Sequence, residues 1–433
     1  MGGKAIIIVT IGLGFVLGYI SMNLSGMATR SVENMSNYAM ATESHNLAIT
    51  GANVGLSKFY GDTSWSGTMT QSFYGGGEDN PLGNLSGSFT VTMEDLTPTS
   101  ARLRSVSTYN SSGEGSIHDT VEVFFDTEQE NGFSLYAWLT GFEGNDDFWV
   151  TGDTIWGRAH SNGNVHVNGK PVFYGKFTVS KGFDPKPGVG TNKAVYKGGY
   201  ETGVATVELP NDLSQIEWAA NNGGRFYNGD IWVVLSGSTG ANEDGFAIIL
   251  ASEGGPVLDT VNINDPGFNG VIMGEDQVSI LGTLDGQLTI ASQNDIYVQD
   301  NIIYENRDLT TSDDVLGLVA DHSVIIANSA PNNPDCEIDG SIFARSGSFE
   351  VEDITSGTPR GNLKVKGSIV QATKGKTGTY AGGTLKKGYA AKYRYDDRLA
   401  DNSFRPPFYP GYGVKTYEIS NWWENVRIPE YAD

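Results

Sequence analysis

The longest hydrophobic pattern in the chain begins after Lys4, with 25 residues that carry no charge, Ala5–Thr29. The next residues, 30–58, contain no proline and place small and apolar side chains at helical spacing. These side chains are Val32, Met35, Ala39, Ala48, Ala52 and Leu56. Together the two stretches predict one N-terminal helix over residues 1–60, hydrophobic in 5–29 and amphipathic in 30–58.

Three interpretations of this helix remain open. A secretory signal would be cleaved near small residues such as Gly26 and Ala28. A membrane anchor would stay in lipid, and a filament helix would pack among copies of itself. Only the filament helix needs the amphipathic continuation, so the pattern favours it. A helix that is apolar all round must be covered by lipid or by other helices, and small residues permit close packing. The residues predicted to pack in a filament are Ile8, Ile11, Gly12, Gly14, Phe15, Gly18 and Tyr19.

The remainder of the chain predicts a mainly β fold. Residues 61–148 contain the alternating stretches SGSFTVTMEDL and ARLRSVSTYN, which predict a small antiparallel β domain. In residues 149–375, short apolar runs separated by Gly- and Asn-containing turns recur every eight to ten residues or so, a rhythm typical of β-solenoids. A right-handed parallel β-helix-like solenoid is favoured, and an antiparallel sandwich is the alternative. Residues 376–433 are aromatic and proline-containing, and they predict a C-terminal cap over the end of the solenoid.

Composition supports strands joined by tight turns, because Gly accounts for 57 of 433 residues and Pro for only 15. The net charge of −23 disfavours binding to nucleic acid, whose phosphates are also negative. The charge is uneven, since residues 360–405 hold 11 Lys and Arg against three Asp and Glu. This local +8 predicts an electrostatic contact between subunits. The residues expected to make that contact are Lys386, Lys387, Lys392 and Arg394.

Candidate chemistry is sparse. His160 and His166 would need a third ligand, such as Asp153 or His322, to hold a metal. A turn between the two histidines is the simpler interpretation. Glycosidases hold two carboxyl groups across a cleft on different elements, which adjacent residues do not predict. The adjacent carboxylate pairs in this chain are Asp146/Asp147, Asp313/Asp314 and Asp396/Asp397. Cys336 lies between two acidic residues, which oppose thiolate formation, and is expected in the core.

No catalytic residue, cofactor or metal ligand is therefore assigned. A structural calcium ion is left open, because DTEQENG at 126–132 alternates oxygen-bearing side chains as calcium loops do. Trp422 and Trp423 are expected to pack within the C-terminal tail, with stacking on sugar rings as the alternative.

The first sixty residues resemble the type IV pilin-like family, especially its PilX-type members. The resemblance rests on a short basic leader, a hydrophobic helix and the stretch NLAITGANVGLSKF. It departs from the family at one position. Pilins carry a Glu five residues into the mature chain, where Ala5 stands if Met1 is the first residue, and the first acidic residue here is Glu33. Residues 150–425 also look similar to a C-terminal domain of pilin-like bacterial surface proteins, through GDTIWGRAHSNGNVHVNGKPVFYG and GQLTIASQNDIYVQDNIIY.

This resemblance implies storage in the inner membrane, extraction by an assembly machinery and a place in an extracellular filament on the bacterial cell surface. The sequence accordingly predicts a structural, non-enzymatic subunit whose main partner is itself, in a helical homopolymer. A glycan-binding adhesin or minor tip pilin is the alternative function. A membrane-tethered polysaccharide-degrading enzyme is the third.

Overall fold

The structure is a computed structural model. It describes residues 2–62, 65–73, 87–97, 100–111, 115–238, 245–333, 335–381, 384–401 and 404–424. Met1 and the last nine residues of the expected cap lie outside this set. The chain divides into two compact units, which we call unit 1 (Met1–Glu128 with Tyr417–Asp433) and unit 2 (Gln129–Thr416). The predicted fold class is confirmed, because a long N-terminal helix is followed by a mainly β body whose parallel sheets are typical of a solenoid.

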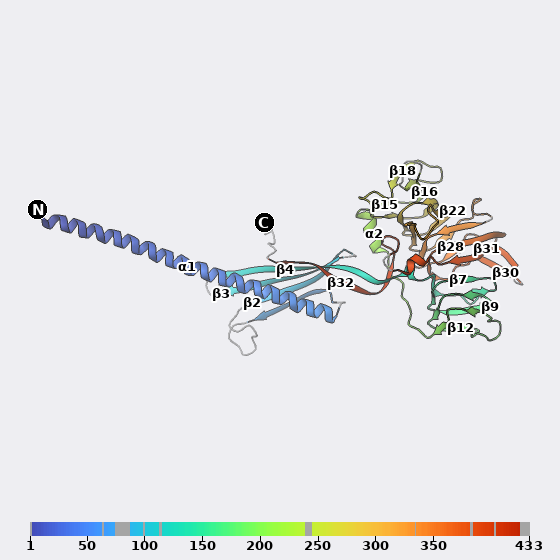
Figure 1. Cartoon of the computed structure of the whole chain (residues 1–433), viewed down its shortest axis with the longest axis horizontal. Coiled ribbons are helices and arrows are strands. Elements are labelled where there is room, and N and C mark those ends of the chain that lie inside the picture. The colour runs from blue at the N-terminus through green and yellow to red at the C-terminus, as the bar shows by residue number, and fades with distance from the viewer. Residues whose placement is uncertain are drawn as a thin grey trace. The chain divides into compact units, whose positions relative to one another are not determined.

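Unit 1 joins the helix α1 (Gly2–Gly61) to a sheet that is predominantly antiparallel (Figure 1). The sheet order is β1 (Gly67–Phe73), β2 (Gly87–Thr97), β3 (Ser100–Ser111), β4 (Gly115–Gly132) and β32 (Gly411–Glu424). The first four strands follow one another in sequence and pair antiparallel. The fifth comes from the C-terminal end of the chain, so this unit contains both ends of the described sequence.

Only the C-terminal third of α1 packs on this sheet. Buried helix residues recur at three- and four-residue intervals: Met40, Ser44, Leu47, Ala48, Gly51, Ala52, Gly55 and Phe59. The sheet contributes Phe89, Val91 and Leu103 to the same core. The amphipathic face was expected to begin near Val32, but Val32 and Met35 are 69% and 77% exposed. The sheet covers the helix only from Met40 onward, and sequence spacing alone could not reveal where that cover ends.

Unit 2 contains three sheets within the described residues, and most of their strands pair in parallel. The largest runs β13 (Val195–Tyr196), β10 (Val172–Phe173), β7 (Thr154–Trp156), β31 (Thr384–Arg394), β28 (Pro359–Lys366), β25 (Cys336–Asp339), β22 (Ile296–Tyr304), β20 (Val278–Leu284), β16 (Ile231–Ser236), β17 (Phe246–Leu250) and β18 (Val257–Asn262), with β24 (Val324–Ile326), β27 (Phe349–Val351) and β30 (Gly378–Ala381) beside it. The second runs β14 (Tyr200–Thr202), β11 (Phe177–Val179), β8 (Ala159–Ser161), β5 (Trp138–Phe142), β29 (Ile369–Thr373), β26 (Ser341–Ala344), β23 (Val315–Ala320), β21 (Gln287–Ser292), β19 (Val271–Gly274) and β15 (Arg225–Tyr227). The third runs β12 (Gly182–Asp184), β9 (Asn164–Asn168) and β6 (Phe148–Val150).

The coils of this solenoid are not stacked in sequence order. In the largest sheet, β16, β20, β22, β25, β28 and β31 succeed one another, and β7, β10 and β13 then continue beyond β31. The solenoid therefore begins in the middle of the sheets, at β5, and winds to the β14 end through residues 138–202. The chain then crosses to the β15 end and winds back toward β5, ending at β29 and β31. The first and last coils meet where β5 pairs with β29 and β7 pairs with β31, both in parallel. We call this junction the seam.

The seam corrects the expected domain boundaries. Residues 376–433 were expected to cap the solenoid, but β31 (Thr384–Arg394) is an interior strand with a parallel partner on each side. Unit 2 also begins at Gln129 rather than at residue 149, and it ends at Thr416. The physical reason is that a parallel ladder needs only a complementary neighbouring edge, so strand spacing in the sequence does not specify which coils stack.

The interior of the solenoid is filled by apolar ladders, such as Val278, Ile296, Val324 and Phe349 in register on successive coils. The outer face of the second sheet is also apolar. It is covered by α2 (Ser214–Asn221) and by residues 404–412, which pack against side chains such as Phe343 and Val370. Strands between these two layers are buried on both faces, which accounts for their continuous apolar runs.

Glycines form a corner column where successive coils approach one another. A Cβ on Gly175 would lie 1.9 Å from the carbonyl oxygen of Gly157, and one on Gly198 would lie 2.3 Å from the carbonyl carbon of Gly175. No side chain fits at such distances. The high glycine content thus has a structural cause in this part of unit 2, because the corners stack backbone on backbone.

Candidate functional site

The most distinctive surface in the molecule is the N-terminal part of α1. From Gly3 to Ala39, every residue whose side chain is described is exposed, apart from Ser36, which is partly buried. The exposed residues include large apolar side chains: Ile6, Ile7, Ile8, Val9, Ile11, Leu13, Phe15, Val16, Leu17, Tyr19 and Ile20. This helix is long and apolar enough to cross a membrane, and none of its most apolar stretch is buried by the described part of the chain. We call residues 3–35, which precede the partly buried Ser36, the free helix segment.

The two parts of α1 use glycine differently. A Cβ on Gly51 would lie 2.3 Å from Ser105 Oγ, and one on Gly55 would lie 2.6 Å from Val91 Cγ1, so these glycines let the sheet approach the helix. Gly12, Gly14, Gly18 and Gly26 have no atoms within 4 Å of a Cβ built on them. Small residues therefore occur on the helix face that contacts the sheet. Further small residues occur in the N-terminal part of the helix, where no described residue outside the helix contacts them.

All seven residues predicted to pack in a filament lie on the free helix segment. Ile8 and Phe15 are 71% and 77% exposed, and Ile11 and Tyr19 are likewise exposed. None is used by the folded chain, so their packing role stays a prediction.

The four predicted electrostatic residues all lie on β31. Lys386, Lys392 and Arg394 are exposed, whereas Lys387 is partly buried and donates a hydrogen bond to the carbonyl of Thr355. Lys392 lies in register with Lys364 on β28, and Arg394 with Lys366. Like charges directly opposite one another destabilise a sheet. On the other side of β28, Glu337 and Asp339 of β25 lie in register with Lys364 and Lys366, and Lys364 pairs with Asp335 at 3.5 Å. Lys392 and Arg394, which form a basic ladder with Lys386 on β31, have no ion pair of their own among the described residues.

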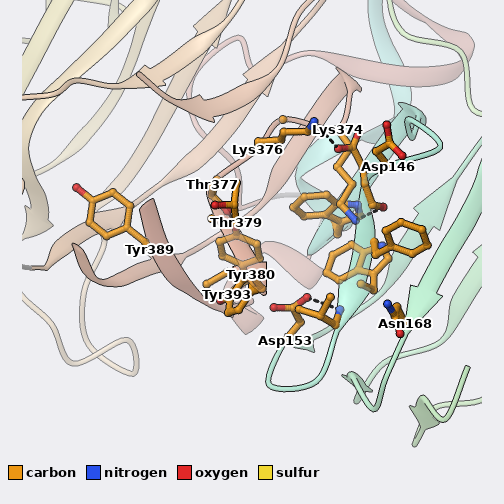
Figure 2. Close-up of a pocket in the computed structure, with 18 residues that line it drawn as sticks. Asp146, Asp153, Asn168, Lys374, Lys376, Thr377, Thr379, Tyr380, Tyr389 and Tyr393 are labelled. Carbon is orange, nitrogen blue, oxygen red and sulfur yellow. Dashed lines mark hydrogen bonds and ion pairs between the residues drawn. The ribbon is translucent and has the colours of Figure 1, made fainter. Parts of the chain in front are cut away.

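A second candidate site is a pocket of about 300 Å³ at the seam, which we call the seam pocket (Figure 2). Its lining comes from residues 138–168 on one side and 374–393 on the other. Aromatic rings form one wall. Trp138 stacks on Tyr393 with ring centroids 5.6 Å apart, and it meets Trp149 edge to face at 5.0 Å. Sequence reasoning missed this pocket because its two sides are more than 200 positions apart and neither carries a recognisable motif.

A buried ion pair lies beside the seam pocket. Lys374 Nζ is 3.5 Å from Glu143 Oε2 and 3.9 Å from the centroid of the Trp149 ring. The indole N–H of Trp149 donates to the same carboxylate at 3.1 Å. Burial raises the pKa of Glu143, while Lys374 and the indole hydrogen bond oppose that shift. The pair therefore holds Lys374, from the last coil, against the first coil.

Asp153 and Tyr380 face each other across the seam pocket. Asp153 Oδ2 accepts a hydrogen bond from the Val150 N–H at 2.8 Å, and burial raises the pKa of this carboxyl. Burial also raises the pKa of Tyr380 to about 12, and the nearby Asp153 charge adds to that shift. Tyr380 therefore keeps its phenolic proton at neutral pH, and its hydroxyl can both donate and accept a hydrogen bond.

The catalytic and metal candidates from the sequence occupy structural positions. His160 lies on β8 and bonds to Thr178 Oγ1 and Asn162 Oδ1, each at 2.8 Å, and burial lowers its pKa. His166 lies on β9, in a different sheet, 3.7 Å from Asp184. His322 pairs instead with Asp295 at 2.7 Å. Among the described residues, no group of three or more His, Cys, Asp or Glu gathers as metal ligands would.

One member of each carboxylate pair is likewise bonded within the fold, whereas Asp146, Asp313 and Asp397 are exposed. Asp314 accepts from the backbone N–H groups of Gly286 and Asn306, and Asp396 makes a two-pronged ion pair with Arg398. Residues 126–132, considered for calcium, belong to strand β4. Cys336 is buried as expected, and burial raises its pKa to about 12.

One expectation about the tail was wrong. Trp423 is 57% exposed on β32 and meets the ring of Phe124 edge to face at 6.2 Å between centroids, so it is not buried in packing. Trp422 is 36% exposed, and its indole N–H donates to Glu424 Oε1 at 2.9 Å.

Comparisons with known proteins add little. No family model matches the chain, and no curated protein sequence matches it. Among solved structures, the chain is similar to the competence-associated pilin ComZ from Thermus thermophilus, at 12% sequence identity. That likeness covers 89% of this chain and 98% of the other, with a TM-score of 0.30. A score this low carries no argument about function.

Proposed function

We propose that this chain is a structural subunit of an extracellular, type IV pilus-like filament, assembled through the free helix segment. The observation that carries the proposal is the change in α1 at residue 40. Beyond that point one face of the helix is buried on its own sheet, whereas the apolar side chains from Ile6 to Met35 are exposed and no described residue covers them. Each such side chain gains roughly 1.5–3 kcal/mol when fully buried, so water is an unstable environment for the segment.

Lipid and neighbouring helices are both able to cover the segment, and the proposal uses each at a different stage. The uncharged run Ala5–Thr29 spans about 37 Å as a helix, enough for the hydrocarbon core of a membrane. This supports an inner-membrane location before assembly. The glycine positions support helix packing afterwards, because in lipid-exposed anchors small residues serve no contact. Gly14 and Gly18 lie four residues apart and on one side of the helix.

The basic ladder on β31 supplies a second contact in this proposal. Lys386, Lys392 and Arg394 would face acidic surface on a neighbouring copy, and the rest of the chain carries a large negative excess. Opposite patches on identical subunits favour a head-to-tail contact, which generates an open filament. Lys387 is withdrawn from this set because its ammonium already bonds to Thr355.

The proposed partners are other copies of the chain and the inner-membrane assembly machinery, and the proposed location is the bacterial cell surface. A catalytic role is not proposed, because Asp314 and Asp396 are committed to structural bonds. A glycan-binding adhesin or minor tip subunit is the second candidate, favoured by the exposed Trp422 and Trp423.

Electron microscopy of surface material sheared from producing cells tests the proposal, with antibody against unit 2 as the label. Filaments labelled along their whole length are expected. Label confined to one end would assign the chain to a tip. Label on the cell body without filaments would reduce it to a tethered surface protein.

A further inference from the structure

The seam pocket is closed by the two coils that the winding order brings together. Trp149, Asp153 and Asn168 come from the first turns of the solenoid, and Lys374 and Tyr380 come from the last. A ligand in the pocket would contact both sides of the seam. Its binding would therefore stabilise unit 2 in addition to filling the pocket.

The charged groups exclude an anionic ligand. Both pocket lysines already have carboxylate partners, since Lys374 pairs with Glu143 at 3.5 Å and Lys376 with Asp147 at 3.6 Å. Asp153 adds a further carboxylate to the lining. An incoming anion would meet this carboxylate and two cations that are already neutralised.

A cationic ligand is disfavoured by the position of Lys374. Aromatic pockets recognise organic cations through the open face of a ring. Here the Lys374 ammonium lies 3.9 Å from the centroid of Trp149, so the protein's own cation occupies that face. The aromatic route to cation binding is therefore closed at Trp149. A cation would have to be held by Asp146 and Asp153 alone, and the cationic probes below test that case.

The groups left over are hydrogen-bonding groups beside apolar rings. One carboxylate oxygen of Asp153 accepts from Val150, and in the described part of the chain the other has no partner. The Asn168 amide and the Tyr380 hydroxyl are likewise without side-chain hydrogen bonds to any described residue. The cavity thus offers the Asp153 carboxylate, the Asn168 amide and the ring of Tyr380. Such a lining fits a ligand with hydroxyl groups around its rim and C–H groups on its faces.

We propose that the seam pocket binds one neutral hexopyranose unit of a glycan. Two ring hydroxyls donate to Asp153, a third group exchanges a hydrogen bond with Asn168, and the sugar's apolar face packs on the Tyr380 side of the pocket (Figure 2). This inference is independent of filament assembly. It gives the molecule a contact with surface carbohydrate whether it lies along a filament or at its tip.

The test is titration of the full chain, held in a detergent without a sugar headgroup, with glucose, galactose, mannose and N-acetylglucosamine. Trp138 and Trp149 line the pocket, so their fluorescence reports occupancy directly. Saturable binding of at least one of these sugars is expected, together with a higher unfolding temperature of unit 2. Choline, spermidine and glucuronate are titrated in parallel as cationic and anionic probes.

Three variants make the result specific. Asp153→Asn and Asn168→Ala should each weaken binding by about tenfold or more, because each removes a polar contact. Asp313→Asn, at an exposed aspartate outside the pocket, is the matched control and should bind as the parent does. If near-ultraviolet circular dichroism shows that Asp153→Asn is unfolded, the affinity of Asn168→Ala, at the exposed rim of the pocket, decides whether the sugar binds there. Absence of binding by all four sugars, equal binding by the pocket variants, or saturation by a charged probe instead would overturn the proposal.

Discussion

Replacing Lys374 with Met is expected to loosen the seam. The substitution replaces the unbranched side chain by another that is one heavy atom shorter, and it removes the charge. Glu143 would then be left fully buried with only the Trp149 indole as a partner. Removing one member of a buried ion pair costs about 3–5 kcal/mol, because the remaining charge is uncompensated. The lost hydrogen bond to the Asp147 carbonyl and the lost contact with the Trp149 ring act in the same direction.

The expected loss grows as the pH rises. Burial raises the pKa of Glu143 and Lys374 opposes the rise, so the variant's Glu143 has a still higher pKa in the folded state. A carboxyl with a raised folded pKa is not penalised below its unfolded value of about 4.3, where it is protonated in both states. Above that value the unfolded state ionises first and folding is penalised. The variant should therefore be closest to the parent near pH 4 and furthest below it near pH 7.

Thermal unfolding of unit 2, followed by tryptophan fluorescence, measures this effect. A loss of about 3 kcal/mol corresponds to a fall of about 5 °C in Tm, because the unfolding entropy of a unit as long as Gln129–Thr416 is about 0.6 kcal/mol/K. Lys376→Met is the matched control, since Lys376 is half exposed and its pair with Asp147 is worth only about 0.2–1 kcal/mol. Equal losses from the two substitutions, or a Lys374→Met loss that shrinks as the pH rises, would refute the reasoning.

Two further predictions test the stacking of coils and the charged contact. Gly175→Ala should destabilise unit 2 by about 1–3 kcal/mol or more, because its Cβ would overlap the Gly157 carbonyl, while Gly182→Ala, with open space around it, should be neutral by chemical denaturation. Reversing Lys392 and Arg394 to Glu should loosen filaments, most strongly at low salt because screening is weakest there, and sedimentation of sheared filaments across a salt series would measure it. Unchanged pelleting at every salt concentration would remove the basic ladder from the interface.

The sequence predicted the elements of this molecule better than their arrangement. The free helix segment was visible because 25 uncharged residues in succession have few structural alternatives. The solenoid strands were visible because apolar pairs such as Ile296 and Val298 recur with turns between them. Local patterns of this kind depend only on neighbours in the chain.

The seam was not predictable by the same means. β31 lies between β28 and β7. This position depends on which strand edges stay unpaired after residues 138–202 and the later coils have each formed, and no sequence pattern near Tyr393 indicates it. The seam pocket depends on that stacking, so Lys374 and Tyr380 could not have been singled out. Lys387 shows the same limit of local sequence patterns. Its charge predicted a contact with another subunit, but its ammonium donates to the carbonyl oxygen of Thr355, which lies 32 residues earlier in the chain.

The central claim is that the free helix segment packs against other copies of itself, and a size series at its glycines tests this most directly. Gly14 and Gly18 are each changed to Ala and to Leu, expressed in the producing cell, and both membrane fractions and sheared filaments are quantified. No atom lies within 4 Å of either Cβ position, so all four variants should fold and insert into the membrane normally. We expect the Ala variants to form filaments and the Leu variants to remain in the membrane without forming them. Normal filament yield from both Leu variants would contradict a helix-packed core.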